Sequence, residues 1–198
     1  YNGAKWAPFK TLTKVNAVKK PGDTILFCRS GTNYGKISRL VGANDKLVIG
    51  DYGTGDEPII SGYAKVVGAW TLTAGKTKIW QIDITNMANL TGNVYYMNTN
   101  IGHLYIGGII CGSRKFGSYN NLLAQWDFFC DATYLYVYSD GSPSAVATSI
   151  EIAPDITLLE IASNHEAYNL QLIGTGGHAV QGNMVKDAVV SRLIIDRI

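Results

Sequence analysis

The feature that most constrains this chain of 198 residues is a repeat within its last part, 156–198. The segment 157–173 matches the segment 178–194 when the two are aligned with a shift of 188 − 167 = 21 residues. Ala167 and Leu172 meet identical residues, and Glu166 meets Asp187. A short period of β-type apolar runs, without a helix-length segment between them, is typical of a solenoid of stacked parallel strands.

A second region repeats with nearly the same period. With a shift of 47 − 25 = 22 residues, the run 25–27 lies over 47–49, Gly31-Thr32 lies over Gly53-Thr54, and Ile37 lies over Ile59. Glycines at the same place in both rungs indicate a corner that needs positive φ. Both regions therefore predict an all-β chain, a parallel β-helix with rungs of about 21–22 residues.

The two ends of this solenoid look different in the sequence. Apolar residues three apart between Phe9 and Val18 predict a short amphipathic helix, which Pro21-Gly22-Asp23 ends. Such a helix would cap the apolar end of the first rung. Nothing in the sequence after the last strand could cover the final rung, so we expect the native polypeptide to continue beyond Ile198 or a partner subunit to cover it. A start at Tyr1 without methionine likewise predicts a processed or excised piece.

Between the two repeats the period disappears. Segment 63–155 holds short strand-like runs separated by turn residues. The runs are 66–67, 78–84, 94–97, 103–106, 126–130, 134–138 and 149–152. We therefore predict three parts: a cap helix with first rungs (1–62), an inserted antiparallel β-subdomain (63–155), and further rungs (156–198).

Charge and composition exclude several classes of partner. Seventeen Lys and Arg against fifteen Asp and Glu give a net charge of +2, and the bases are scattered. No basic stripe for nucleic acid or a membrane surface is present, and no apolar run approaches the ~18 residues of a membrane span. Cys28, Cys111 and Cys130 lack metal-ligand spacing. We expect buried small hydrophobes, with a Cys111–Cys130 disulfide left open.

Several motifs follow one another in a recognisable order. They are Pro8-Phe9-Lys10-Thr11-Leu12, then 20–27 with its proline-glycine-aspartate turn, then the glycine-rich 50–55, and then Pro58-Ile59-Ile60-Ser61-Gly62. This order resembles the opening of right-handed parallel β-helix proteins of the pectate-lyase superfamily. Leu135-Tyr136-Val137 resembles the aromatic strand that ends a β-rich insertion in similar proteins. The resemblance covers 6–62 and 157–198.

The resemblance implies a carbohydrate-directed protein. Members of the superfamily include polysaccharide lyases, glycoside hydrolases and bacteriophage tailspikes. It implies an extracellular or virion-surface protein that binds surface or extracellular polysaccharide, and whether it also cleaves it, as a lyase or hydrolase, stays open. The alternative is a non-catalytic structural or adhesive fibre, for example a homotrimer. Calcium is implied by the family only, since the sequence shows no acidic cluster for it; no other cofactor or metal is expected.

Glu166 and Asp187 are the candidate catalytic residues. They are one period apart, so stacked rungs would place them about 4.8 Å apart on adjacent strands. Two carboxylates that close acquire different pKa values and can act as acid and base, and a spacing near 5 Å suits a retaining glycosidase. The alternative interpretation is that both are solvated turn residues.

Aromatic residues of the insert are candidates for sugar binding. Sugar rings stack on Trp and Tyr while their hydroxyls pair with amides. The candidates are Trp70, Trp126, Tyr95 and Tyr119, with Asn120 beside the last. The alternative is that most of them fill the core of the insert. His178, after the glycine-rich turn 174–177, is a further candidate contact, or a corner residue bonded to backbone.

Overall fold

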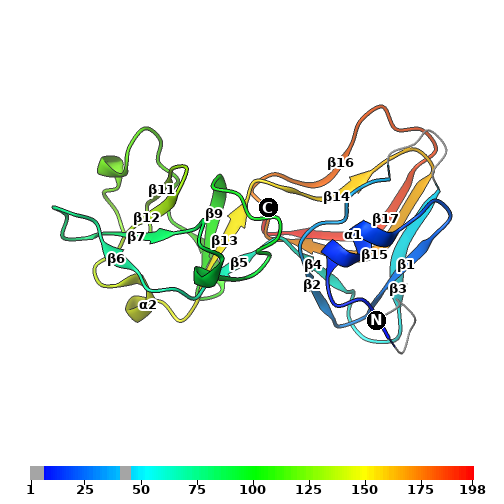
Figure 1. Ribbon diagram of the computed structural model, residues 1–198, viewed down its shortest axis with the longest axis horizontal. Coiled ribbons are helices and arrows are strands. Elements are labelled where there is room, and N and C mark those ends of the chain that lie inside the picture. The colour runs from blue at the N-terminus through cyan, green and yellow to red at the C-terminus, as the bar shows by residue number, and fades with distance from the viewer. Residues whose placement is uncertain (1–6, 41–45) are drawn as a thin grey trace. The chain divides into compact units, whose positions relative to one another are not determined.

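A computed structural model describes residues 7–40 and 46–198, and its regular structure is almost entirely β (Figure 1). The chain forms two compact units. The first comprises the residues up to Gly62 together with Ile156–Gly174 and His178–Ile198, and the second comprises Tyr63–Asp155 with Thr175–Gly177. Each unit has its own apolar core.

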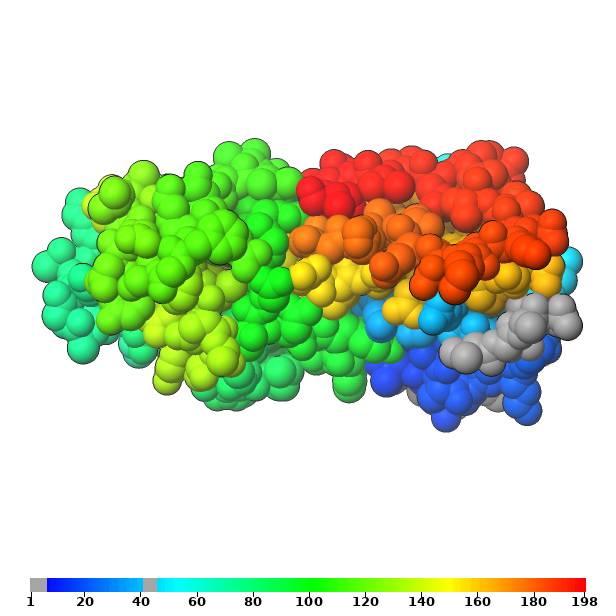
Figure 2. Space-filling view, turned by 90° about the horizontal axis from the view of Figure 1, so that it is seen from above, coloured from blue at the N-terminus to red at the C-terminus, as the bar shows by residue number. Residues whose placement is uncertain are grey.

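The first unit is a parallel β-helix, as predicted, with three faces. The first face stacks β1 (Thr24–Cys28), β3 (Leu47–Tyr52) and the first halves of β15 (His165–Ile173) and β17 (Val189–Asp196). The second face stacks β2 (Thr32–Tyr34), β4 (Ile59–Ser61) and the second halves of β15 and β17. The third face pairs β14 (Thr157–Ile161) with β16 (His178–Gly182), and Ile37 bridges to Leu159 beside them. Figure 2 shows these rungs in order, from blue and cyan through yellow and orange to red.

Alternate residues of these strands point inward and form the core of the first unit. Ile49, Ile60, Leu159, Leu170 and Leu172 are completely buried, and they come from all three faces. Aliphatic side chains at every second position stack over one another from rung to rung. The solenoid therefore buries apolar area inside its own coil and needs no second sheet or helix layer packed against it.

A chain of polar side chains joins four rungs at the corner between the first and second faces. Arg192 Nε donates to Asn169 Oδ1 at 2.6 Å, Asn169 Nδ2 donates to Asp51 Oδ1 at 2.8 Å, and Arg29 Nε donates to Asp51 Oδ2 at 2.8 Å. Asn169 and Arg192 have φ values of 55° and 50°. This left-handed conformation, which asparagine tolerates well, turns β15 and β17 through the corner without a loop.

The strand registers depart from the expected shifts where turns differ in length. The shift of 21 is confirmed on the third face, where Leu159 pairs with Val180. On the first face Ile25 pairs with Ile49 rather than Leu47, a shift of 49 − 25 = 24 residues. Because side chains alternate with a period of two, an error of two residues does not change which side chains point inward and which point outward. The predicted core residues are therefore correct despite this error in register.

The predicted pairing on the second face is wrong. Thr32 pairs with Ile59 rather than Thr54, because 53–58 forms an additional loop before β4. Ile37 bridges to Leu159 and not to Ile59. Cys28 is exposed, since it points away from the core next to inward-facing Phe27, so its expected burial is wrong.

The predicted cap helix is present as α1 (Leu12–Val18). Thr11 is its N-cap, accepting a hydrogen bond from the Lys14 N–H. Leu12 and Val15 are buried, and Leu12 belongs to the solenoid core. At the other end β17 pairs only with β15 among the described strands. Its inward-facing Ile195 is 52 % exposed. Among the described residues, α1 therefore covers the first rung, and no other strand pairs with the outer edge of β17.

The second unit packs two antiparallel sheets. One contains β10 (Ile109–Cys111), β9 (Ile101–Ile106), β13 (Ile150–Pro154), β5 (Ala64–Val66) and β8 (Leu90–Gly92). The other contains β11 (Phe128–Cys130), β12 (Tyr134–Tyr138), β7 (Ile79–Asp83) and β6 (Thr71–Leu72). The short helices are η1 (Met87–Asn89), η2 (Tyr119–Asn121) and α2 (Pro143–Val146).

Both sheets of the second unit contribute to one core. Leu104 and Ile152 from the first sheet pack with Phe128 and Leu135 from the second. The strand expected at 94–97 is absent, because the chain turns after Gly92 (φ 90°), with the Val94 N–H donating to its carbonyl at 2.9 Å. Cys111 and Cys130 are half-buried free thiols, so the disulfide left open above does not form.

Candidate functional site

A polar pocket of about 230 Å³ lies on the third face of the solenoid. Arg39, Glu160, Gln181 and Asn183 line it. They come from three successive rungs: Arg39 follows the bridge at Ile37, Glu160 lies on β14, and the two amides lie on and just after β16. Glu160 and Gln181 are register partners, so the stacking of the strands itself places their side chains next to each other.

Glu160 is the centre of the hydrogen bonding around this pocket. Its Oε1 accepts from Lys36 Nζ at 2.8 Å, and its Oε2 accepts from the backbone N–H of Arg39 at 3.3 Å. Burial opposes ionisation of the carboxyl, but the hydrogen bonds and positive charges of Lys36 and Arg39 outweigh it and lower the pKa of Glu160. Glu160 is thus an ionised acceptor at neutral pH.

The cap helix fixes the segment that carries these cations. Asn16 of α1 donates to the Lys36 carbonyl at 2.9 Å, and its Oδ1 accepts from Lys19 Nζ at 2.8 Å and from the Ser38 N–H at 3.0 Å. Burial lowers the pKa of Lys19. The negative charge of Glu160 partly offsets this shift, and the positive charge of Lys36 adds to it.

On the far side of the pocket Gln181 Oε1 accepts from Thr157 Oγ1 at 2.8 Å. We call the set Lys19, Lys36, Arg39, Glu160, Gln181 and Asn183 the polar strip. It runs across the rungs from α1 to β16 and offers cationic, amide and carboxylate groups to a ligand. Such a mixture of donors and acceptors suits a polyhydroxyl molecule.

The predicted pairing of Glu166 with Asp187 is wrong. Glu166 pairs with Val189, because the chain takes 166 − 161 = 5 steps from Ile161 to Glu166 but 189 − 182 = 7 steps from Gly182 to Val189. Glu166 instead forms an exposed ion pair with Lys46 at 3.2 Å, and Asp187 lies exposed in the longer turn. The solvated-turn interpretation fits Asp187 but not Glu166, which lies half-buried on β15. A catalytic role for either residue stays an untested prediction without its geometric basis.

The predicted sugar-binding residues separate into three environments. Trp70 is 7 % exposed in the core of the second unit, and half-buried Trp126 packs against the same core, as the alternative interpretation expected. Tyr95 is 68 % exposed on an irregular segment. Only Tyr119 and Asn120, neighbours on η2, lie together on one surface.

His178 belongs to the first unit. It is exposed at the start of β16, and its backbone N–H donates to the Ile156 carbonyl at 3.2 Å. It lies on the same strand as Gln181 but does not line the polar pocket.

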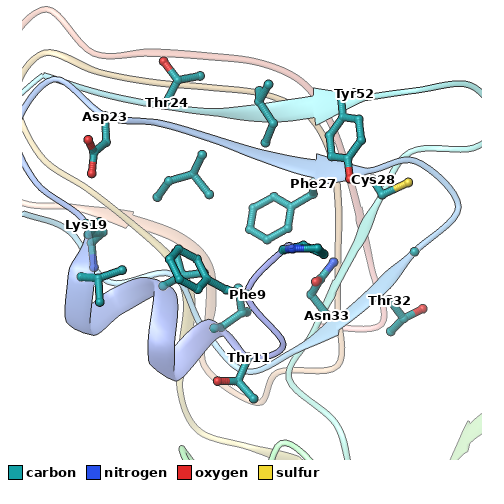
Figure 3. A pocket seen from close by; sticks show the side chains of 17 residues that line it. Phe9, Thr11, Lys19, Asp23, Thr24, Phe27, Cys28, Thr32, Asn33 and Tyr52 are labelled. Carbon is teal, nitrogen blue, oxygen red and sulfur yellow. The ribbon is translucent and has the colours of Figure 1, made fainter. Parts of the chain in front are cut away.

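A larger pocket of about 320 Å³ lies between α1 and the first rung (Figure 3). Phe9 and Phe27 face its interior, with Lys19 and Asp23 at one end and Asn33 at the other. Apolar side chains of α1 and β1 make up much of the lining. This pocket is therefore less suited to a polyhydroxyl ligand than the polar strip.

Sequence reasoning did not find the polar strip, although one signal was present. Glu160 over Gln181 is part of the 21-residue repeat, and both are polar at an outward position. Lys36 and Arg39 carried no signal, because the insert separates them from Glu160 by more than a hundred residues of sequence. Among the described residues no group of three His, Cys, Asp or Glu could hold a metal ion, and no helix there is long and apolar enough to cross a membrane.

Comparison with known proteins supports the fold. No protein-family model matches the chain, and no curated protein matches it significantly. A solved structure, described as the complex of XylC with xylose, matches with a TM-score of 0.63 and 12 % sequence identity. The match covers 98 % of this chain and 38 % of that chain, so the present chain spans well under half the length of XylC. At this identity the likeness establishes the β-helix architecture and nothing further.

Proposed function

We propose that the chain binds a polysaccharide through the polar strip. The observation that carries the proposal is the pocket in which Arg39, Glu160, Gln181 and Asn183 converge from three rungs. Sugar hydroxyls both donate and accept hydrogen bonds, and a strip that crosses the rungs offers such partners along the solenoid. The fold shared with XylC, whose structure contains xylose, is consistent with this choice of ligand.

The geometry favours binding over cleavage. Glycoside hydrolysis commonly needs two carboxyl groups, one of which donates a proton. Glu160 is the single carboxylate among the described residues that line the pocket. Its lowered pKa and its ion pair with Lys36 leave it without a proton to donate at neutral pH. The proposed activity is therefore polysaccharide binding.

Affinity gel electrophoresis tests this proposal with xylan, mixed-linkage glucan and polygalacturonate as separate probes. The double variant Gln181→Ala/Asn183→Ala removes two side chains of the pocket. Each neutral hydrogen bond contributes about 0.5–1.5 kcal/mol, so we expect affinity for the retained polymer to fall about 5- to 150-fold. Glu166→Gln, an exposed site outside the pocket, is the matched control and should bind normally. Undiminished binding by the double variant would refute the assignment.

A second candidate, which the family resemblance left open, is a structural or adhesive fibre that assembles from several copies. This candidate predicts a trimer by light scattering, whereas a monomer that binds polysaccharide supports the first proposal. A location outside the cell or on a virion surface stays a prediction under both.

A further inference from the structure

The outer face of the β11–β12–β7–β6 sheet in the second unit carries a group of aromatic rings. Alternation along β12 points Leu135 and Val137 into the core and leaves the tyrosines on the opposite side. We call this group the aromatic face. It consists of Tyr119, Phe129, Tyr134, Tyr136 and Tyr138.

Tyr136 is the buried centre of the aromatic face. The Tyr119 ring stacks on it with centroids 4.7 Å apart and an angle of 25° between the planes. Phe129 and Tyr134 pack around it in tilted arrangements at 5.9 and 6.0 Å. Tyr119, Phe129, Tyr134 and Tyr138 are half-buried, so parts of four rings face solvent around one fixed ring.

Hydrogen bonds hold this arrangement rigid. The Tyr136 hydroxyl donates to Asp131 Oδ2 at 3.1 Å, and Asp131 Oδ1 accepts from the backbone N–H groups of Thr133 and Tyr134, both at 2.7 Å. The N-cap Ser118 fixes η2, accepting from the Asn120 N–H at 3.1 Å. Rings that are already ordered lose little conformational entropy when a ligand stacks on them.

The formal charges next to the aromatic face balance, with Lys76 and Lys78 against Asp131 and Asp140. Lys78 Nζ lies 5.8 Å from the Tyr138 ring centroid and pairs with Asp140 at 2.8 Å. Lys76 Nζ lies 5.9 Å from the Tyr119 ring centroid. A face with ring surfaces, hydroxyls and an exposed amide at Asn120, but with little net charge, matches a neutral sugar better than a nucleic acid or an acidic polymer.

We propose that the aromatic face is a second binding site, which stacks the rings of a neutral oligosaccharide on Tyr134, Tyr138 and Tyr119. This site is independent of the polar strip, because it lies wholly in the second unit and uses ring stacking where the strip uses charged and amide groups. It goes beyond the proposed function by assigning a second sugar-binding site that uses none of the residues of the polar strip.

Isothermal titration with xylohexaose, cellohexaose and mannohexaose tests the proposal on the complete chain. The titrations use the Gln181→Ala/Asn183→Ala background, so that the contribution of the polar strip is reduced. Tyr134→Ala and Tyr138→Ala should each weaken the remaining affinity about two- to tenfold, the range for one aromatic contact. Tyr138→Phe keeps the ring and should bind nearly normally. Tyr34→Ala, an exposed tyrosine on β2 of the first unit, is the matched control.

Circular dichroism establishes that each variant folds. If Tyr138→Ala does not fold, Tyr138→Leu replaces it, because leucine keeps apolar volume but lacks a ring. Loss of hexasaccharide binding with the ring variants, together with retention in Tyr34→Ala, supports the second site. Unchanged binding in Tyr138→Leu overturns it, as does a wild-type chain that binds none of the three sugars. In the wild-type background, loss of binding by the ring variants with retention by Gln181→Ala/Asn183→Ala refutes the polar strip and supports the aromatic face. The reverse result refutes the aromatic face and supports the strip.

Discussion

Leu172 and Ile195 occupy the same column of the solenoid core but should differ widely in what they contribute to stability. They are register partners on β15 and β17, yet Leu172 is fully buried between rungs while Ile195 is 52 % exposed. Leu172→Ala leaves a cavity enclosed by neighbouring rungs and should cost about 3–5 kcal/mol. Ile195→Ala loses roughly half the transfer free energy of a buried side chain and encloses no cavity, so it should cost about 1 kcal/mol.

Differential scanning calorimetry with urea titration can measure both changes. Because the chain has two cores, the solenoid transition must be identified first, and Ile152→Ala, in the core of the second unit, should move the other transition. If Ile195→Ala destabilised the solenoid as much as Leu172→Ala, the last rung would be covered in solution and the reasoning would fail. A cost that grows with protein concentration would identify a second copy as the cover.

Three further predictions follow from individual contacts. The pKa of Glu160 is lowered in the folded chain, so its stabilising effect should be complete above its ordinary value of 4.5 and be lost as the pH falls through the folded pKa; the melting temperature of Glu160→Gln should lack this acid dependence. Burial lowers the pKa of His103, so the neutral ring stabilises the fold above pH 6.5, and this stability is lost as the pH falls through the folded pKa. The melting temperature of His103→Gln should therefore depend less on pH in this range than that of the wild-type chain, and an equal dependence would contradict the prediction. Gly102→Ala places a Cβ 2.2 Å from the Gly176 Cα and should cost about 1–3 kcal/mol by urea unfolding, whereas Gly141→Ala, whose Cβ meets only a Val146 methyl at 3.1 Å, should cost much less.

The architecture could be predicted from the sequence because chemically similar residues recur at equivalent positions of the stacked rungs. The pairing of Leu159 with Val180 could be read directly, since the 21-residue shift of the repeat is also the register of β14 against β16. The predicted pairing of Glu166 with Asp187 was wrong because the turn before β17 is two residues longer than the turn before β15. The pattern of apolar residues does not reveal the length of a turn. The in-and-out alternation tolerates such even-numbered shifts, so the core was predicted better than the surface.

The candidate sites were harder to foresee because both depend on contacts between distant segments. The partner of Glu160, Lys36, lies on the far side of the insert in sequence. Tyr119 was identified as a platform, but its stacking partner Tyr136 was read only as part of a strand. Trp70 illustrates the converse error, since composition alone does not distinguish a ring that fills a core from one that faces solvent.

The corner at which the insert leaves the solenoid has a consequence for how such chains diversify. β4 and β14 are joined by 95 residues (156 − 62 + 1), whereas the next rung connects β15 to β16 with only 174–177. Gly62 and Gly174 lie close together at this corner, with the Gly62 N–H donating to the Ile173 carbonyl at 2.9 Å. A graft of any length can therefore begin and end here at a closure cost that rises only with the logarithm of its size. Evolution or protein engineering can therefore exchange whole inserts at this position while the solenoid keeps its stacking.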